Sequence, residues 1–113
     1  MKSFVLNVTT PLYLDFCSYD ASRHSVMNYH YSKIMPRGKL VRFGVFEFGK
    51  FVGSVLYGMS NCGNLGKLFK LTEFQICELV RVALKGHTNT VSKIVSISIK
   101  LLKKHCPGLK MIV

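Results

Sequence analysis

Residues 77–113, CELVRVALKGHTNTVSKIVSISIKLLKKHCPGLKMIV, contain the pattern that decides the fold. CELVRVAL at 77–84 is a short, apolar and β-branched run, which is typical of a buried strand. The turn KGHTNT follows it, and Pro107 with Gly108 precedes a last apolar run, LKMIV at 109–113. If the segment between these two strands is a helix, the stretch is a βαβ unit, which joins two parallel strands by a right-handed crossover.

The segment between them, VSKIVSISIKLLKK at 91–104, fits a helix or a strand. As a strand, it alternates strictly from Val95 to Leu101, and its β-branched content agrees. Its length, the Thr and Asn residues before it and the lysines near its end favour a helix. One face of this helix would be mainly apolar, with Val91, Ile94, Val95, Ser98 and Leu102. Another would be mainly basic, with Lys93, Ser96, Lys100, Lys103 and Lys104.

The N-terminal part predicts one strand and one helix. Residues 3–10, SFVLNVTT, have the composition of a strand, which Pro11 ends. Residues 20–34, DASRHSVMNYHYSKI, predict a helix with Asp20 as its N-cap. Pro36 and a glycine two residues later stop that helix.

Two β-rich runs in the middle of the chain predict a hairpin. They are LVRFGVFEF at 40–48 and FVGSVLYG at 51–58, with GK between them. A loop at 59–71 follows. Thr72 and Gln75 then fit a capping box, which predicts a short helical turn.

The order strand, helix, hairpin, strand, helix, strand predicts an α/β (α+β) domain, with helices flanking a mixed β-sheet. At 113 residues, of which 49% are hydrophobic, the chain has room for one domain with one core. Residues 1–113 are therefore expected to form a single domain. Charges interrupt every apolar run, so no transmembrane helix and no membrane partner are expected.

Charge is strongly one-sided. Sixteen Lys and Arg face five acids, a net charge of +11, and no acid follows Glu78. Such a field favours a polyanion as partner: nucleic acid first, then phosphorylated cofactors, then an anionic membrane surface. The alternative is a solvated basic face that serves solubility.

The four cysteines are scattered and form no C-x-x-C pair. With no secretory signal, reduced thiols in a cytoplasm explain them most simply. The cysteines and histidines lack metal-ligand spacing, which argues against a structural zinc site.

The turn before the second helix is a candidate anion site. GHTNTVSK at 86–93 would present the helix N-terminus, the hydroxyls of Thr88, Thr90 and Ser92, and the Lys93 cation to a pyrophosphate. The segment is neither a Walker motif nor a G-x-G-x-x-G fingerprint. An ordinary capped helix is the alternative.

A second cluster, NYHYSK at 28–33, alternates aromatic and polar residues ahead of Arg37 and Lys39. A histidine beside tyrosines suits proton transfer or metal ligation. Aromatic rings among cations also suit stacking on a nucleobase. The alternative is a helix end whose aromatic side chains pack on the sheet.

Glu78 and Arg81 interrupt the apolar strand at 77–84. Three residues apart in a regular strand, they are expected on opposite faces. One of them would face a ligand cleft, or would pair with a charge on a neighbouring element.

Several of these segments together resemble the Mom family of phage DNA-modification proteins. They are HYSK at 30–33, MP at 35–36, ELVRVAL at 78–84, VSKIVSISIKLLKK at 91–104 and PGLKMIV at 107–113. The resemblance implies a GCN5-related N-acetyltransferase-like fold and a helix at 91–104. It also implies addition of a carbamoylmethyl (acetamido) group to adenine N6 in double-stranded DNA, which protects the DNA from host restriction enzymes.

The resemblance also implies roles for individual residues. His30 and Tyr31 match the family's HY pair at the active site, with His30 as an iron ligand or proton shuttle and Tyr31 at the base pocket. Arg81, Thr90, Ser92 and Lys93 match the region that binds a coenzyme A thioester. The duplex would lie on a basic surface made of Lys33, Arg37, Lys39, Lys100, Lys103 and Lys104. The adenine would be flipped out, with Tyr29 or Tyr31 stacking on it.

Family members continue the last strand into a stretch like SFAD, whose Asp is a proposed catalytic residue, whereas this sequence ends at Val113. The comparison implies a domain truncated after its fifth strand: a fragment, a shortened member or one partner of a split protein. The rival hypothesis is a non-catalytic module in the host cytoplasm that binds DNA or inhibits a host defence. Its exposed last strand would pair with a protein partner or a second copy.

Overall fold

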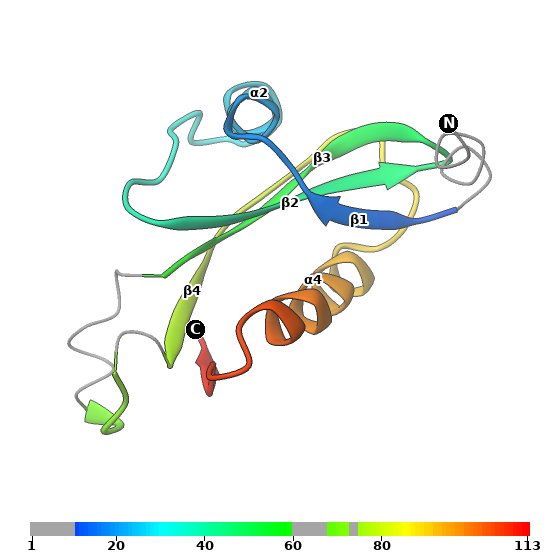
Figure 1. Cartoon of the computed structure of the whole chain (residues 1–113). Coiled ribbons are helices and arrows are strands. Elements are labelled where there is room, and N and C mark those ends of the chain that lie inside the picture. Colours follow the sequence, from blue (N-terminus) through cyan, green and yellow to red (C-terminus); the bar gives the residue numbers. More distant parts are fainter. Residues whose placement is uncertain (1–10, 60–67, 73–74) are drawn as a thin grey trace.

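The computed structural model describes residues 11–59, 68–72 and 75–113, which form a five-stranded sheet with a helix on each face (Figure 1). The elements along the chain are β1 (Tyr13–Phe16), α2 (Tyr19–Tyr29), β2 (Leu40–Glu47), β3 (Lys50–Gly58), β4 (Ile76–Leu84), α4 (Val91–His105) and β5 (Met111–Ile112). The strand order is β1-β2-β3-β4-β5. Strands β1 to β4 are antiparallel neighbours and β5 joins β4 in parallel, so the expected mixed sheet is confirmed.

Alternation of side chains along the strands gives the sheet two apolar faces. The larger core lies between the sheet and α4, where Phe43, Tyr57, Ile94 and Leu102 are fully buried. A smaller core lies under α2 and is built from Val26, Leu56 and Ala83. In the described part of the chain, neither helix is long and apolar enough to cross a membrane.

The hairpin prediction is confirmed, with a shift of one residue in the turn. Phe48 and Gly49 form the two-residue connection with φ of 52° and 80°, and Glu47 pairs with Lys50 across it. Positive φ at both positions is the type I′ pattern that fits the twist of two antiparallel strands. The GK dipeptide therefore straddles the end of the turn and the start of β3.

The helical interpretation of residues 91–104 is confirmed, and so is the parallel pairing of the strands around it. The Thr90 hydroxyl caps α4 by accepting a hydrogen bond from the Lys93 N–H at 3.2 Å. Ile94, Ser98 and Leu102 are buried as expected. Val91 at the start of the helix is 46% exposed, so this part of the expected apolar face is not buried.

Two N-terminal predictions are wrong. Ser18, and not Asp20, caps α2: its hydroxyl accepts from the Ala21 N–H at 3.1 Å. The helix ends at Tyr29, five residues early, because His30 takes an extended ψ of 141°. Strand β1 follows Pro11, where no strand was expected.

Three predictions fall wholly or partly outside the described residues. The strand expected at 3–10 lies outside them, as does most of the loop expected at 59–71. Of the capping box, the described half is present: the Gln75 side chain accepts from the Thr72 N–H at 2.9 Å. Residues 73–74 of that turn are not described.

A bulge in β4 corrects the prediction for Glu78 and Arg81. Leu79 pairs with Tyr57 and Arg81 with Leu56, so Val80 is an extra residue without a partner on β3. Glu78 and Arg81 therefore lie opposite Gly58 and Leu56, which alternate to the same face. That face is the one covered by α2, and the extra residue is the reason why a spacing of three does not separate the two charges.

Candidate active site and nucleic-acid interface

His30 lies immediately after α2, where its backbone N–H still donates to the Val26 carbonyl at 3.2 Å. Its ring Nδ1 accepts from the Ser32 N–H at 3.1 Å and lies 2.8 Å from the Ser32 hydroxyl. Because Nδ1 is an acceptor here, the neutral ring carries its proton on Nε2. The Tyr31 ring stacks on this imidazole at 4.5 Å between centroids and is 93% exposed.

Burial, and then the positive charge of Arg81, lower the pKa of His30. The ring is therefore neutral near pH 7, because its ordinary pKa of about 6.5 already lies below that pH. A neutral imidazole with Nδ1 occupied presents one functional group outward, the Nε2–H. It is equipped to donate a hydrogen bond to an oxygen on which negative charge develops.

The predicted iron ligation by His30 does not fit this arrangement. Nδ1 is engaged by Ser32, and Nε2 bears the proton in this tautomer, so neither nitrogen offers a lone pair to a metal. Within the described ranges, no group of three or more His, Cys, Asp and Glu side chains could hold a metal ion.

Arg81 lies in β4 and contacts the loop from His30 to Lys39, which follows α2 and is called the His30 loop. Its Nε donates to the Ile34 carbonyl at 3.1 Å, and its Nη1 donates to its neighbour Val80 at 2.7 Å. The structure thus brings together Arg81 and His30, which are 51 positions apart in the chain. It does not bring Arg81 together with the residues predicted to share its cofactor site, since α4 packs on the opposite face of the sheet (Figure 1).

Replacing Arg81 by alanine is expected to raise the pKa of His30. The substitution removes the nearby cation and, by freeing the loop, exposes the ring, and both changes favour the protonated form. Titration of the ring protons by NMR measures the shift. Arg23→Ala, which removes an exposed charge from α2, is the matched control and should leave the pKa unchanged. An unaltered pKa in Arg81→Ala would contradict the contact.

The turn before α4 is already occupied by an internal carboxylate. Glu47, which is 5% exposed, accepts from the Thr88 N–H at 2.7 Å and hydroxyl at 3.1 Å. It also accepts from the backbone and side-chain amides of Asn89, both at 2.8 Å. Burial alone would raise the pKa of Glu47, but these four hydrogen bonds outweigh it and lower the pKa to about 2. The first half of the predicted pyrophosphate cradle therefore holds Glu47.

At the start of α4, the exposed side chains of Ser92 and Lys93 are left to meet an external anion. The Thr90 hydroxyl is engaged in capping the helix. These residues suit the phosphate end of a cofactor in the chemistry of their groups, a hydroxyl and an ammonium beside a helix N-terminus. They lie on the far side of the sheet from His30 and Arg81.

The six predicted DNA-contacting cations are all exposed, and they form two groups. Lys33, Arg37 and Lys39 follow α2, whereas Lys100, Lys103 and Lys104 lie on α4. At the sheet edge, a cavity of about 200 Å³ is lined by residues from β1, β2 and the end of α4, namely Phe16, Cys17, Leu40, Val41, Arg42 and His105. Two of its lining residues, Leu40 and His105, follow Lys39 and Lys104 directly in the chain.

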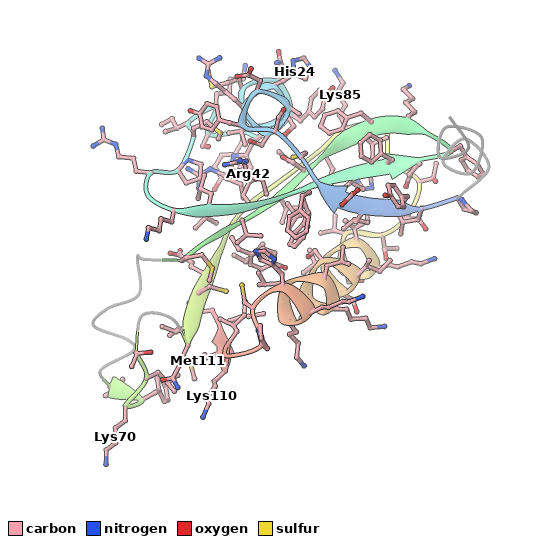
Figure 2. The ribbon with its side chains drawn as sticks, viewed as in Figure 1. His24, Arg42, Lys70, Lys85, Lys110 and Met111 are labelled. Atoms are coloured by element: carbon pink, nitrogen blue, oxygen red, sulfur yellow. The ribbon has the colours of Figure 1, made fainter. Side chains whose placement is uncertain are left out.

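Arg42 and His105 are cations or potential cations of this edge that the sequence reasoning missed. Arg42 donates from Nε to the Cys17 carbonyl at 3.3 Å, and Figure 2 shows it projecting from β2 on the side of α2. The His105 ring lies 4.9 Å from that of Phe16, edge to face. The signal for Arg42 was its position as the one charge within LVRFGVF. Lys70 and Lys110 project outward at the end of the molecule near β5 (Figure 2).

Comparison with known proteins gives one result at the level of families. The model of the Mom protein family matches residues 11–113, which is nearly the whole chain. No curated protein matches the sequence.

Proposed function

Because the chain belongs to the Mom protein family, whose members are associated with phage DNA modification, we propose that it adds a carbamoylmethyl (acetamido) group to adenine N6 in double-stranded DNA. The observation that carries the proposal is the pairing of a neutral His30 with a stacked and exposed Tyr31. The loop that holds them also carries three exposed cations, Lys33, Arg37 and Lys39.

Each part of this loop has a task in the reaction. Adenine N6 is inaccessible inside a duplex, so the base is extruded, and Tyr31 offers an exposed ring face on which it stacks. The His30 Nε2–H would donate a hydrogen bond to the carbonyl oxygen of the carbamoylmethyl group and so orient the group towards N6. Arg81 positions the loop through the Ile34 carbonyl and keeps His30 neutral.

A coenzyme A thioester is the proposed cofactor. Ser92 and Lys93 are the residues proposed to meet its phosphates, and Thr90 caps the helix just before them. Arg81 is proposed to position the loop and not to bind the cofactor, because its guanidinium donates hydrogen bonds to two carbonyl oxygens.

Nucleoside mass spectrometry of DNA from cells that express the chain tests the proposal. A heavier adenosine is expected with the unmodified sequence, and at least about 100-fold less of it with His30→Ala, as for the loss of a preorganised donor. His24→Ala, which removes an exposed histidine from α2, is the matched control and should leave the product unchanged. Unmodified adenine in the presence of folded protein would contradict the proposed activity.

The second candidate is DNA binding without catalysis. What favours it is the separation of the two predicted halves of the active site, His30 with Arg81 on one face of the sheet and Ser92 with Lys93 on the other. In that case the duplex affinity still falls with salt, with a log–log slope near −0.9 for each phosphate contacted, while adenine stays unmodified.

A further inference from the structure

The loop from His30 to Lys39 holds an apolar side chain out in solvent. Ile34 is 64% exposed, although the next residue, Met35, packs against the core under α2. Its exposure is therefore not the consequence of a loose segment. It results from a backbone that turns one side chain inward and the preceding one outward.

Hydrogen bonds fix this backbone at several points. The Ile34 carbonyl accepts from Arg81, and the Ile34 N–H lies 3.4 Å from the Ser32 hydroxyl. The Lys33 N–H donates to the His30 carbonyl at 3.3 Å, and Lys33 has a positive φ of 52°. A lysine in the left-handed region is uncommon, and the contacts on both sides of it hold it there.

The surroundings of Ile34 select the kind of partner. Lys33, Arg37 and Lys39 are exposed on the same loop, and the described part of the loop contains no acid. An exposed apolar side chain among cations matches a duplex, in which phosphates lie on either side of stacked bases. Proteins that kink DNA insert isoleucine, leucine, phenylalanine or methionine between base steps in this way.

We propose that Ile34 is a DNA wedge: it enters the stack beside the target adenine, while the three cations hold the flanking phosphates. The inference rests on the proposed function, since it takes double-stranded DNA as the partner. It adds a residue whose role is to stabilise the opened duplex and not to touch the reacting atoms. Tyr31, three residues earlier in the chain and stacked on His30, receives the base that the wedge displaces.

A wedge favours duplexes that are already weakened, because a mismatched pair costs less to unstack. The purified chain is therefore expected to bind a duplex with one central mismatch about 10-fold more tightly than the matched duplex. Ile34→Ala should reduce that preference to less than about 2-fold, whereas Ile34→Leu should retain it. Fluorescence anisotropy measures both affinities, and 2-aminopurine at the mismatch reports the unstacking directly.

Salt dependence separates the wedge from the cations. Ile34→Ala should leave the log–log salt slope unchanged, whereas Lys33→Gln should reduce it by about 0.9 and keep the mismatch preference. Both residues are exposed, so equal melting temperatures are expected and confirm that the variants fold.

The binding and modification experiments together test whether Ile34 acts as a wedge. The wedge is overturned if Ile34→Ala keeps the mismatch preference and the 2-aminopurine signal, or if the unmodified chain binds no duplex. If the chain modifies adenine and Ile34→Ala changes neither the mismatch preference nor the 2-aminopurine signal, the wedge is refuted and the proposed activity stands. A mismatch preference that depends on Ile34, without any modified adenosine, would support the wedge and refute the enzyme. Loss of protein binding from Ile34→Ala with no effect on DNA would assign the loop to a protein partner instead.

Discussion

Replacing Gly53 by alanine is expected to abolish the folded sheet. Gly53 has a φ of 145°, and a Cβ built on it would lie 1.9 Å from the Ala83 carbonyl oxygen and 2.8 Å from the Leu84 Cα. Both are backbone atoms of the neighbouring strand, so no side-chain rotation relieves the clash. The site lies where β3 pairs with β2 on one side and β4 on the other. The cost is expected to exceed about 4 kcal/mol, which approaches the whole stability of a domain this size.

Thermal unfolding followed by circular dichroism measures the effect, and two other glycines are its controls. Gly108→Ala should change the unfolding free energy by less than about 0.5 kcal/mol, because an added Cβ meets nothing within 4 Å. Gly86→Ala should cost about 1 kcal/mol, since the space is open but φ is 72°. A Gly53→Ala protein as stable as Gly108→Ala would refute the register of the three central strands.

Replacing Glu47 by glutamine is expected to destabilise the fold by about 2 kcal/mol at neutral pH. The carboxylate joins the tip of the β2–β3 hairpin to the turn before α4 through four hydrogen bonds from Thr88 and Asn89. The glutamine amide would direct its own N–H groups at these donors and leave some of them unsatisfied. Chemical denaturation of both proteins gives the difference in unfolding free energy.

The dependence of this difference on pH provides a second check. The pKa of Glu47 is about 2 in the folded protein, below its ordinary value of 4.5, so the carboxylate stabilises the fold fully above about pH 4.5. That stabilisation is lost as the pH falls from there towards 2. The shift corresponds to at most about 3 kcal/mol, which is consistent with the loss of about 2 kcal/mol expected for Glu47→Gln. Equal stabilities of wild type and Glu47→Gln at pH 7 would contradict the hydrogen-bonded arrangement.

Local patterns predicted the parts of the fold that depend on neighbouring residues. The β-branched alternation on both sides of the Phe48–Gly49 turn specified the hairpin. The Thr90 cap and the lysines at the end of α4 correctly favoured a helix where strict alternation favoured a strand. The cap of α2 was predicted two residues late because Ser18 and Asp20 are both good caps, and only the hydrogen bond to Ala21 distinguishes them.

Long-range contacts determined what the sequence could not predict. The bulge at Val80 is a property of the register between β3 and β4, and it reverses the facing of Arg81. Glu47 reaches its partners across 41 positions, and no local signal connects a hairpin tip with a distant turn. Likewise, no local signal connects His30 with Arg81, which are 51 positions apart in the chain. The candidate residues were therefore recognisable individually, but their grouping into sites was not.

Arg81 anchors the His30 loop through a carbonyl oxygen of the main chain, that of Ile34. Every amino acid carries such an oxygen, so the shape of the loop is largely independent of the side chains that it displays. Single substitutions at Tyr31, Lys33 or Ile34 can then alter what the loop recognises while the backbone platform persists. Such a separation of shape from chemistry is what allows a recognition surface to diverge rapidly without passing through unfolded intermediates.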